Sequence, residues 1–210
     1  IDEEQTKTIS PKDEQQLLDN IKSNISSFDL ILLSDYLKGV LSERVTQNII
    51  KMAKRNNLPV FIDIKDPNIG KYYGATLLKP KRSELSLTTG MPVNSKEEIL
   101  LAAQTLMKKC GAEYVLTTLG SKGMLLVGSK KEEWILCTEH EVYDVSGAGD
   151  TVISYLSALY ANDYSIEKAV YYANIAAGIK VTKIGTAPVY VEELYRLVAG
   201  QEQKREDKIV

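Results

Sequence analysis

The sequence is poor in the residues that build metal centres, disulfide frameworks and catalytic triads. Its 210 residues include two cysteines, Cys110 and Cys137, and one histidine, His140. The cysteines have neither C-x-x-C spacing nor nearby companion ligands, which argues against a zinc site and a disulfide scaffold. We expect both to be buried thiols in a reducing compartment, and we expect His140 to be structural or at the surface.

The sequence also lacks an excess of one charge and any long hydrophobic run. Lys and Arg total 26, Asp and Glu total 28, and the sequence pI is near 5.6. The chain has no excess of positive charge that would predict binding to nucleic acid or to an anionic membrane. No apolar run approaches the roughly 20 residues of a membrane span, and no signal-peptide pattern begins the chain. These absences predict a globular cytoplasmic protein without nucleic-acid or membrane partners.

Both ends of the sequence are polar and charged. The chain starts at Ile1 rather than Met and ends with the charged run "GQEQKREDKIV". We therefore interpret it as a piece of a longer protein. We expect a partly ordered lead-in over 1–27, the folded part over 28–199, and a tail over 200–210.

Between these ends, short apolar runs alternate with helical patterns. Such alternation with short connections predicts an α/β open sheet, in which ligands gather at the carboxyl ends of the strands. No internal repeat is present. We expect strands over 28–36, 58–64, 75–80, 112–120, 123–129 and 132–139, and helices over 42–55, 81–87, 95–109, 149–161, 165–181 and 191–197.

Five polar clusters each follow an expected strand. Any one of them alone is more often a capped helix or a turn. Because all lie at equivalent ends, together they predict a shared crevice. The clusters are "SDYLKG" (34–39), "DIKD" (63–66), "KPKRSE" (79–84), "TTLGSKG" (117–123) and "DVSGAGD" (144–150).

The last cluster has the features of an anion site. Gly147 and Gly149 permit backbone geometries that a side chain would obstruct, and N–H groups at a helix start attract anions. Asp150 then falls in the first helical turn, where the helix dipole keeps it ionised and able to accept a proton. This arrangement favours phosphoryl transfer to a hydroxyl. The alternative is that Asp150 only caps the helix.

Other nucleotide and hydrolase patterns do not occur. The sequence contains no Walker A motif and no G-x-G-x-x-G after a strand. "DVSGAGD" also misses the G-x-S-x-G elbow, because Asp144 stands where that motif requires glycine. Trp134 and the tyrosines Tyr155, Tyr160, Tyr171 and Tyr172 are interpreted as packing residues.

"DVSGAGDT" resembles the motif of the ribokinase-like (PfkB) carbohydrate kinases, and "TTLGSKG" before it and "ANIAAGIKVTKIGT" after it occur in the family's order. The resemblance runs from about Phe28 to Leu197. Within the family, "LSDYLKG", "IDIKD" and "GATLLKPKRSEL" are most similar to the D-glycero-β-D-manno-heptose 7-phosphate kinase domain, usually joined to an adenylyltransferase domain. The resemblance implies a ribokinase-like fold, with a mainly parallel sheet and helices on both of its faces. It also implies that the family's first strands and lid sheet are absent from this chain.

The resemblance also implies roles for individual residues. Asp150 matches the catalytic base, and Gly147, Ala148 and Gly149 match the anion hole for the γ-phosphate. Asp144 matches a ligand of a monovalent cation, K⁺, with carbonyls near Ser146 and in the 181–186 loop as companions. The nucleotide side is matched by Lys81, Arg82, Ser83, Glu84, Thr118, Gly120, Ser121, Gly123 and Asn174.

Lys81–Glu84 occupies the place of the family's N-x-x-E element, in which Glu84 would act on Mg²⁺ through water. This sequence has Lys81 instead of Asn, and a lysine can contact phosphate as a point charge. The sugar-phosphate side is assigned to Asp35, Lys38, Asp63 and Lys65.

The implied activity is ATP- and Mg²⁺-dependent phosphorylation of a heptose phosphate, in a complete protein that is homo-oligomeric. Residues 200–210 would then begin a linker to a fused downstream domain. Two alternatives stay open: a ribokinase-like kinase for another sugar, and a nucleotide-binding module without turnover.

Overall fold

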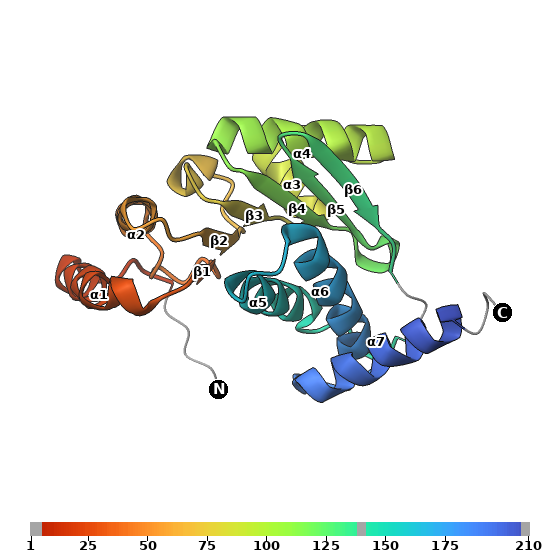
Figure 1. Ribbon diagram of the computed structural model, residues 1–210. Helices are drawn as coiled ribbons and strands as arrows, with labels where there is room; N and C mark the ends of the chain where they lie inside the picture. Colours follow the sequence, from red (N-terminus) through yellow and green to blue (C-terminus); the bar gives the residue numbers. More distant parts are fainter. Residues whose placement is uncertain (1–5, 138–141, 207–210) are drawn as a thin grey trace. The chain divides into compact units, whose positions relative to one another are not determined.

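The computed structural model describes residues 6–137 and 142–206, so His140 lies outside the described residues. The chain divides into two compact units (Figure 1). The first, here called the sheet unit, runs to Gly120 and includes Met124–Trp134. The second, the helical unit, comprises Ser121–Gly123 and the chain from Ile135 onward.

A six-stranded sheet with the strand order β1-β2-β3-β4-β5-β6 forms the centre of the sheet unit. The first four strands are parallel, in agreement with the predicted mainly parallel sheet, and β5 runs antiparallel to β4. Parallel strands buried on both faces need apolar runs such as "VFI" and "LL". The strands are β1 (Ile31–Ser34), β2 (Val60–Asp63), β3 (Leu77–Lys79), β4 (Tyr114–Thr118), β5 (Met124–Gly128) and β6 (Lys131–Ile135).

Four helices pack on one face of this sheet. Alternate strand residues such as Leu33, Ile62 and Leu78 join one core cluster with apolar residues of these helices. Phe61 and Leu77, which point to the opposite face, are buried as well. The helices are α1 (Pro11–Asn24), α2 (Glu43–Arg55), α3 (Arg82–Thr89) and α4 (Lys96–Cys110), with short 3₁₀ turns η1 (Ile25–Ser27) and η2 (Ile69–Tyr72) between them.

Local sequence signals set the ends of these helices. Ser42 caps α2 by accepting a hydrogen bond from the Val45 amide, and Ser95 and Glu98 form a capping box on α4. Gly90 and Gly111 end α3 and α4 in the left-handed conformation that glycine adopts without strain. The predicted boundaries of α2, α3 and α4 are correct to within two residues.

The helical unit contains α5 (Ala148–Ala161), α6 (Ile166–Val181) and α7 (Val191–Glu206). Ile175, Ile179 and Leu194 form a buried cluster between α6 and α7. The Tyr155 hydroxyl donates a hydrogen bond of 3.0 Å to the Val189 carbonyl. Tyr171 and Tyr172 pack edge to face, as expected for packing residues. None of the helices described has the length and apolar character needed to cross a bilayer.

The lead-in, expected to be partly ordered, holds α1, a helix that was not predicted, and its Leu18 is only 6% exposed. Two further expectations differ from the structure. The last helix extends to Glu206 rather than 197. Cys110 is a buried thiol as expected, but Cys137 is only half-buried. Burial raises the pKa of the Cys110 thiol to about 11.

We predict that Leu18→Ala lowers the free energy of unfolding by about 2 kcal/mol, because it removes a buried contact of α1 with the core. Urea denaturation measures this change. Gln16→Ala, at an exposed position of the same helix, is the control and should shift stability by no more than about 0.5 kcal/mol. Equal, small effects of both substitutions would show that α1 does not contribute to the fold.

Candidate functional site

Hydrogen bonds join the polar clusters of the sheet unit in pairs. The Asp35 amide, just after β1, donates to the Asp63 carbonyl at 3.1 Å. The Thr118 amide, at the end of β4, donates to the Pro80 carbonyl at 3.0 Å. Because β1 to β4 are parallel, these four clusters lie at one edge of the sheet, as predicted. The fifth cluster belongs to the helical unit, and a crevice shared by all five stays a prediction.

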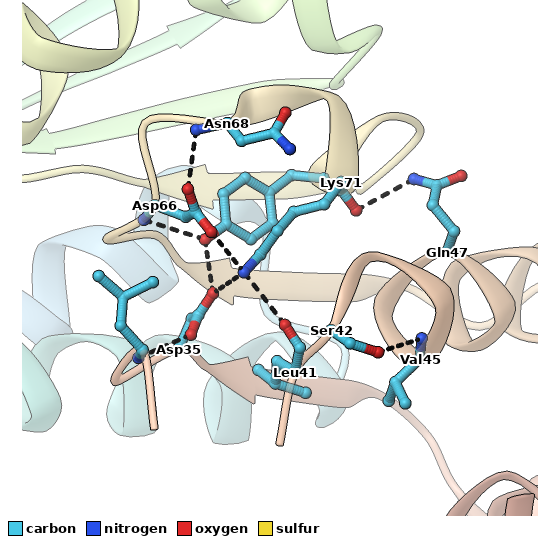
Figure 2. A network of polar contacts seen from close by, with 10 residues as sticks. Asp35, Leu41, Ser42, Val45, Gln47, Asp66, Asn68 and Lys71 are labelled. Carbon is cyan, nitrogen blue, oxygen red and sulfur yellow. Dashed lines mark hydrogen bonds and ion pairs between the residues drawn. The ribbon is translucent and has the colours of Figure 1, made fainter. Parts of the chain in front are cut away.

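A buried lysine that sequence reasoning missed organises the first two clusters (Figure 2). Lys71, in η2, is 5% exposed. Its Nζ lies 2.6 Å from Asp35 Oδ2, 2.9 Å from Asp66 Oδ2 and 3.1 Å from the Leu41 carbonyl oxygen. An ammonium group has three donors, so these three acceptors can satisfy it. Burial opposes its charge, but the hydrogen bonds that it donates to Asp35 and Asp66 are together stronger and raise the pKa of Lys71.

Asp35 is the other half of this network and is 2% exposed. It accepts hydrogen bonds from the Tyr72 hydroxyl at 2.7 Å and from the Leu37 amide at 2.9 Å. Burial favours the neutral acid, yet the hydrogen bonds from Lys71, Tyr72 and Leu37 hold the pKa of Asp35 below its ordinary value. Its carboxylate is thus occupied by protein groups.

The network fixes the loop after β1. Leu37 has a φ of 56°, a strained value for a side chain of this size, and its amide is held by Asp35. At Gly39, φ is 86° and an added Cβ would lie 2.1 Å from the Lys7 carbonyl oxygen, so only glycine fits. Lys38 is exposed on this loop, and the Lys65 ammonium lies 3.8 Å from the ring centre of Tyr36. Both lysines predicted for the sugar phosphate therefore lie on segments that the Lys71 network holds.

Asp63 and Lys79 form a second buried ion pair. They are neighbours in the register of β2 and β3, and Lys79 Nζ lies 2.8 Å from Asp63 Oδ1. Lys79 has no exposed surface and Asp63 is 2% exposed. Neither of the two atoms makes a well-oriented hydrogen bond within the described residues. Within the described residues, the Lys79 ammonium thus lacks the well-oriented hydrogen bonds that Lys71 makes with its three acceptors.

The predicted Lys81–Glu84 element begins α3. Glu84 Oε2 accepts a hydrogen bond from the Lys81 amide at 2.6 Å, and this closes the first turn. Arg82 Nε donates to the Val93 carbonyl at 2.7 Å. Lys81 and Ser83 are exposed. The Lys81 side chain is thus at the surface at the carboxyl edge of the sheet.

The turn after β4 contains η3 (Gly120–Lys122). Gly120 and Gly123 have φ of 62° and 88°. An added Cβ at Gly123 would lie 1.9 Å from the Ile135 carbonyl oxygen, which excludes any side chain there. Thr118 is half-buried and Ser121 is exposed, so this turn presents a hydroxyl and backbone groups, as a nucleotide turn would.

In the helical unit, the "DVSGAGD" turn leads into α5. Gly147 precedes the helix with a φ of 75°, and Asp150 is the third helical residue, exposed to solvent. The first amides of a helix have no acceptor within it. The Ala148 amide finds an acceptor outside the helix, because it donates to the Val145 carbonyl at 3.2 Å. Gly147 and Gly149 are therefore the better candidates for anion donors.

Asp144 holds this turn against the loop after α6. Its Oδ1 accepts from the Ser146 amide at 2.8 Å and its Oδ2 accepts from the Gly185 amide at 3.0 Å. The hydrogen bonds from Ser146, then that from Gly185, lower the pKa of Asp144, and the charge of Lys180 adds to this. Asn174, predicted for the adenine site, is buried and donates to the Leu136 carbonyl at 2.8 Å.

Comparison with known proteins assigns this arrangement to a family. The profile of the pfkB family of carbohydrate kinases matches residues 2–193. The chain belongs to this family. It is 40% identical over its whole length to bifunctional protein HldE of Rhodospirillum rubrum and 40% identical to that of Syntrophotalea carbinolica. It spans 42% and 43% of those two proteins.

Solved pfkB-type structures share the fold. Arabidopsis thaliana ribokinase, solved with ribose and ATP, gives a TM-score of 0.70 at 25% identity, over 85% of this chain and 55% of its own. Phosphofructokinase-2 from Escherichia coli, solved with potassium, gives a TM-score of 0.80 at 18% identity, over 91% of this chain and 63% of its own. The predicted α/β ribokinase-like fold is confirmed.

We predict that Lys71→Met lowers the free energy of unfolding by about 3–5 kcal/mol at neutral pH, because it leaves the Asp35 carboxylate buried without its cation. The double variant Asp35→Asn, Lys71→Met should cost less than the sum of the single changes. Urea denaturation of the four proteins measures this coupling. Lys38→Met, at an exposed position, is the control, and a cost for Lys71→Met as small as the control's would contradict the network's role.

Acid should weaken the same network. The pKa of Asp35 is lower in the folded than in the unfolded chain, so its contribution is present above about pH 4 and is lost as the pH falls through the folded value. In the double variant that part of the acid dependence should be missing. Unfolding free energies measured between neutral pH and pH 3 test this, and identical slopes for both proteins would count against it.

Proposed function

We propose that this chain is the nucleotide-binding, base-carrying part of a kinase that phosphorylates the anomeric hydroxyl of D-glycero-β-D-manno-heptose 7-phosphate. The product is the 1,7-bisphosphate, an intermediate of ADP-heptose and lipopolysaccharide core synthesis. The observation that carries the proposal is Asp150, exposed in the first turn of α5 behind the left-handed Gly147. Membership of the pfkB family and the 40% identity to HldE proteins support the substrate.

In the proposed reaction, the Asp150 carboxylate accepts the proton of the sugar hydroxyl as its oxygen forms a bond to the γ-phosphorus of ATP. The bond from that phosphorus to the β,γ-bridging oxygen breaks, and ADP leaves. Amides of Gly147 and Gly149 stabilise the negative charge on the transferred group. Asp150 later releases the proton to solvent.

We assign the nucleotide to the turn at Thr118–Gly123 and to Lys81, whose exposed ammonium is placed to meet a phosphate. Mg²⁺ would neutralise the phosphates of ATP, with Glu84 acting through water. In the described part of the chain no group of three or more His, Cys, Asp or Glu is arranged to hold a metal ion. This fits Mg²⁺, which keeps several waters and relies on substrate phosphates.

We further propose that the complete protein joins this chain to a second catalytic domain, an adenylyltransferase, and works as a cytoplasmic homo-oligomer. The HldE relatives are named bifunctional, and this chain spans less than half of their length. Lys38 and Lys65 are proposed to face the 7-phosphate, with Asp35 and Asp63 behind them. Asp35 would act by holding the loop of Lys38, since its own oxygens are occupied.

An acceptor panel tests the substrate. ADP release by the full-length protein is measured with D-glycero-β-D-manno-heptose 7-phosphate, fructose 6-phosphate and ribose. We expect the heptose phosphate to have the highest kcat/KM. A preference for another sugar would favour the broader ribokinase-like alternative, and nucleotide binding without turnover of any acceptor would favour the non-catalytic module.

Asp150→Asn tests the base. Asparagine keeps the shape and is a good residue at a helix start, so stability should change by about 1 kcal/mol or less. It cannot accept the proton, so kcat should fall by about 10²–10⁴-fold, while ATP affinity stays within a few-fold. Steady-state kinetics and titration calorimetry measure the two quantities. Near-normal turnover with an intact fold would reduce Asp150 to a helix cap.

A further inference from the structure

A buried lysine lies beside the turn that leads to Asp150. Lys180, near the end of α6, is 3% exposed, and its Nζ donates a hydrogen bond of 2.6 Å to the Gly185 carbonyl oxygen. An added Cβ at Gly147 would lie 3.3 Å from Lys180 Cε. The lysine side chain therefore runs between the loop after α6 and the glycine that starts α5. Burying an ammonium group is costly unless oxygens compensate its charge.

The surroundings of this ammonium are rich in oxygen. Asp144 binds the Gly185 amide, while Lys180 binds the carbonyl of the same residue. The Val181 carbonyl accepts from the amides of Tyr143, at 2.8 Å, and Asp144, at 3.2 Å. The Lys180 ammonium thus binds a loop carbonyl, and its charge also acts on the Asp144 carboxylate.

These residues fit a free monovalent cation poorly. The K⁺ expected from the sequence needs Asp144 and carbonyls near Ser146 and in the 181–186 loop as ligands. One of that loop's carbonyls, Gly185 O, already has the Lys180 ammonium as its donor, and both Asp144 oxygens accept amide hydrogens. An ammonium group next to these oxygens repels a second cation.

We propose that the Lys180 ammonium takes the place of a monovalent cation and makes the protein's nucleotide site independent of K⁺. Lys180 is a positioning residue: it draws the 183–186 loop, and through Asp144 the Gly147 turn, into the arrangement that the anion hole needs. A tethered ammonium is present at every salt concentration, whereas an ion must bind. E. coli phosphofructokinase-2, by contrast, has been solved with potassium.

The test uses the salt dependence of thermal unfolding of the full-length protein. Melting temperatures are measured in KCl and in tetramethylammonium chloride at equal ionic strength. For the wild type we expect no difference. Lys180→Ala removes the charge and opens space, so it should melt lower in tetramethylammonium and regain about 2–4 °C in KCl, as expected for a cation that binds the folded state.

Two variants serve as controls. Lys180→Met removes the charge but fills the space, so KCl should not restore it. Lys183→Ala removes a neighbouring lysine that donates to the Pro188 carbonyl and to Glu193, away from Asp144, and its loss should be equal in both salts. A wild type that itself needs K⁺ would overturn the proposal, even if none of the variants folds. Equal loss for Lys180→Ala in both salts would overturn it too, since that is the behaviour of a merely structural lysine.

The catalytic consequence rests on the proposed kinase function and has its own measurement. In tetramethylammonium, kcat of Lys180→Ala should fall about tenfold, less than the roughly 10²–10³-fold loss of a direct anion-hole donor, and KCl should restore it. If no sugar is phosphorylated even by the wild type, the proposed function fails, while the melting temperatures still decide the role of Lys180.

Discussion

Ammonium groups held among oxygens inside the protein are the interaction on which both units depend. Lys71 binds two carboxylates and a carbonyl, Lys79 meets Asp63 across two strands, and Lys180 meets the Gly185 carbonyl. Lys71 and Lys180 join segments that do not pair in a regular element, whereas Lys79 and Asp63 are neighbours in the register of β2 and β3. The apolar core determines where strands and helices pack, but it does not determine the path of the loops that follow them. A buried charge does determine the path of these loops, because only a few arrangements of the chain surround it with enough oxygen atoms.

This explains why the polar loops are ordered without being apolar. Replacing a buried ion pair with hydrophobic residues often stabilises a protein, so these lysines are weak evidence for high stability. Their effect is on geometry. Lys71 holds the Asp35 carboxylate in place, and this carboxylate accepts the hydrogen bond of the Leu37 amide. The strained backbone at Leu37 is stabilised in this way. Strain of this kind persists only where surrounding contacts over-determine it.

Much of the fold could be read from the sequence, and the misses have physical causes. Parallel strands and helices depend on residues close together in the chain, so apolar runs and helical spacing predicted them, and the caps Ser42 and Ser95 are local in the same way. The signal for α1 was also local: Ser10 caps the helix, Pro11 stands in its first turn, and Leu17, Leu18 and Ile21 have helical spacing. The polar composition of residues 1–27 outweighed it, because composition says little about a short amphipathic segment.

The residues of the candidate site also divide into those that local sequence predicted and those that it did not. The glycine turn at Gly147–Gly149 was predictable because its chemistry is contiguous. Lys71 was not, since its partner Asp35 lies 36 residues away and nothing near "GKYYG" indicates burial. Lys180 was missed for a different reason: in "AAGIKVTK" it reads as one of two surface lysines near a helix end, where a positive charge is favoured by the dipole. Only the fold shows that Lys180 turns inward and Lys183 turns toward Glu193.

The inward position of Lys180 bears on how the proposed anion hole keeps its conformation. A left-handed glycine at the start of a helix has many alternatives in an unconstrained chain, and fixing one residue costs about 1–2 kcal/mol of entropy. Asp144 restrains the turn from one side through Ser146 and Gly185, but a carboxylate alone would add negative charge close to the proposed phosphate site. The buried ammonium group of Lys180, near the end of α6, offsets that charge. The turn therefore needs a carboxylate and a positive charge together, and in this chain the positive charge is covalently part of α6.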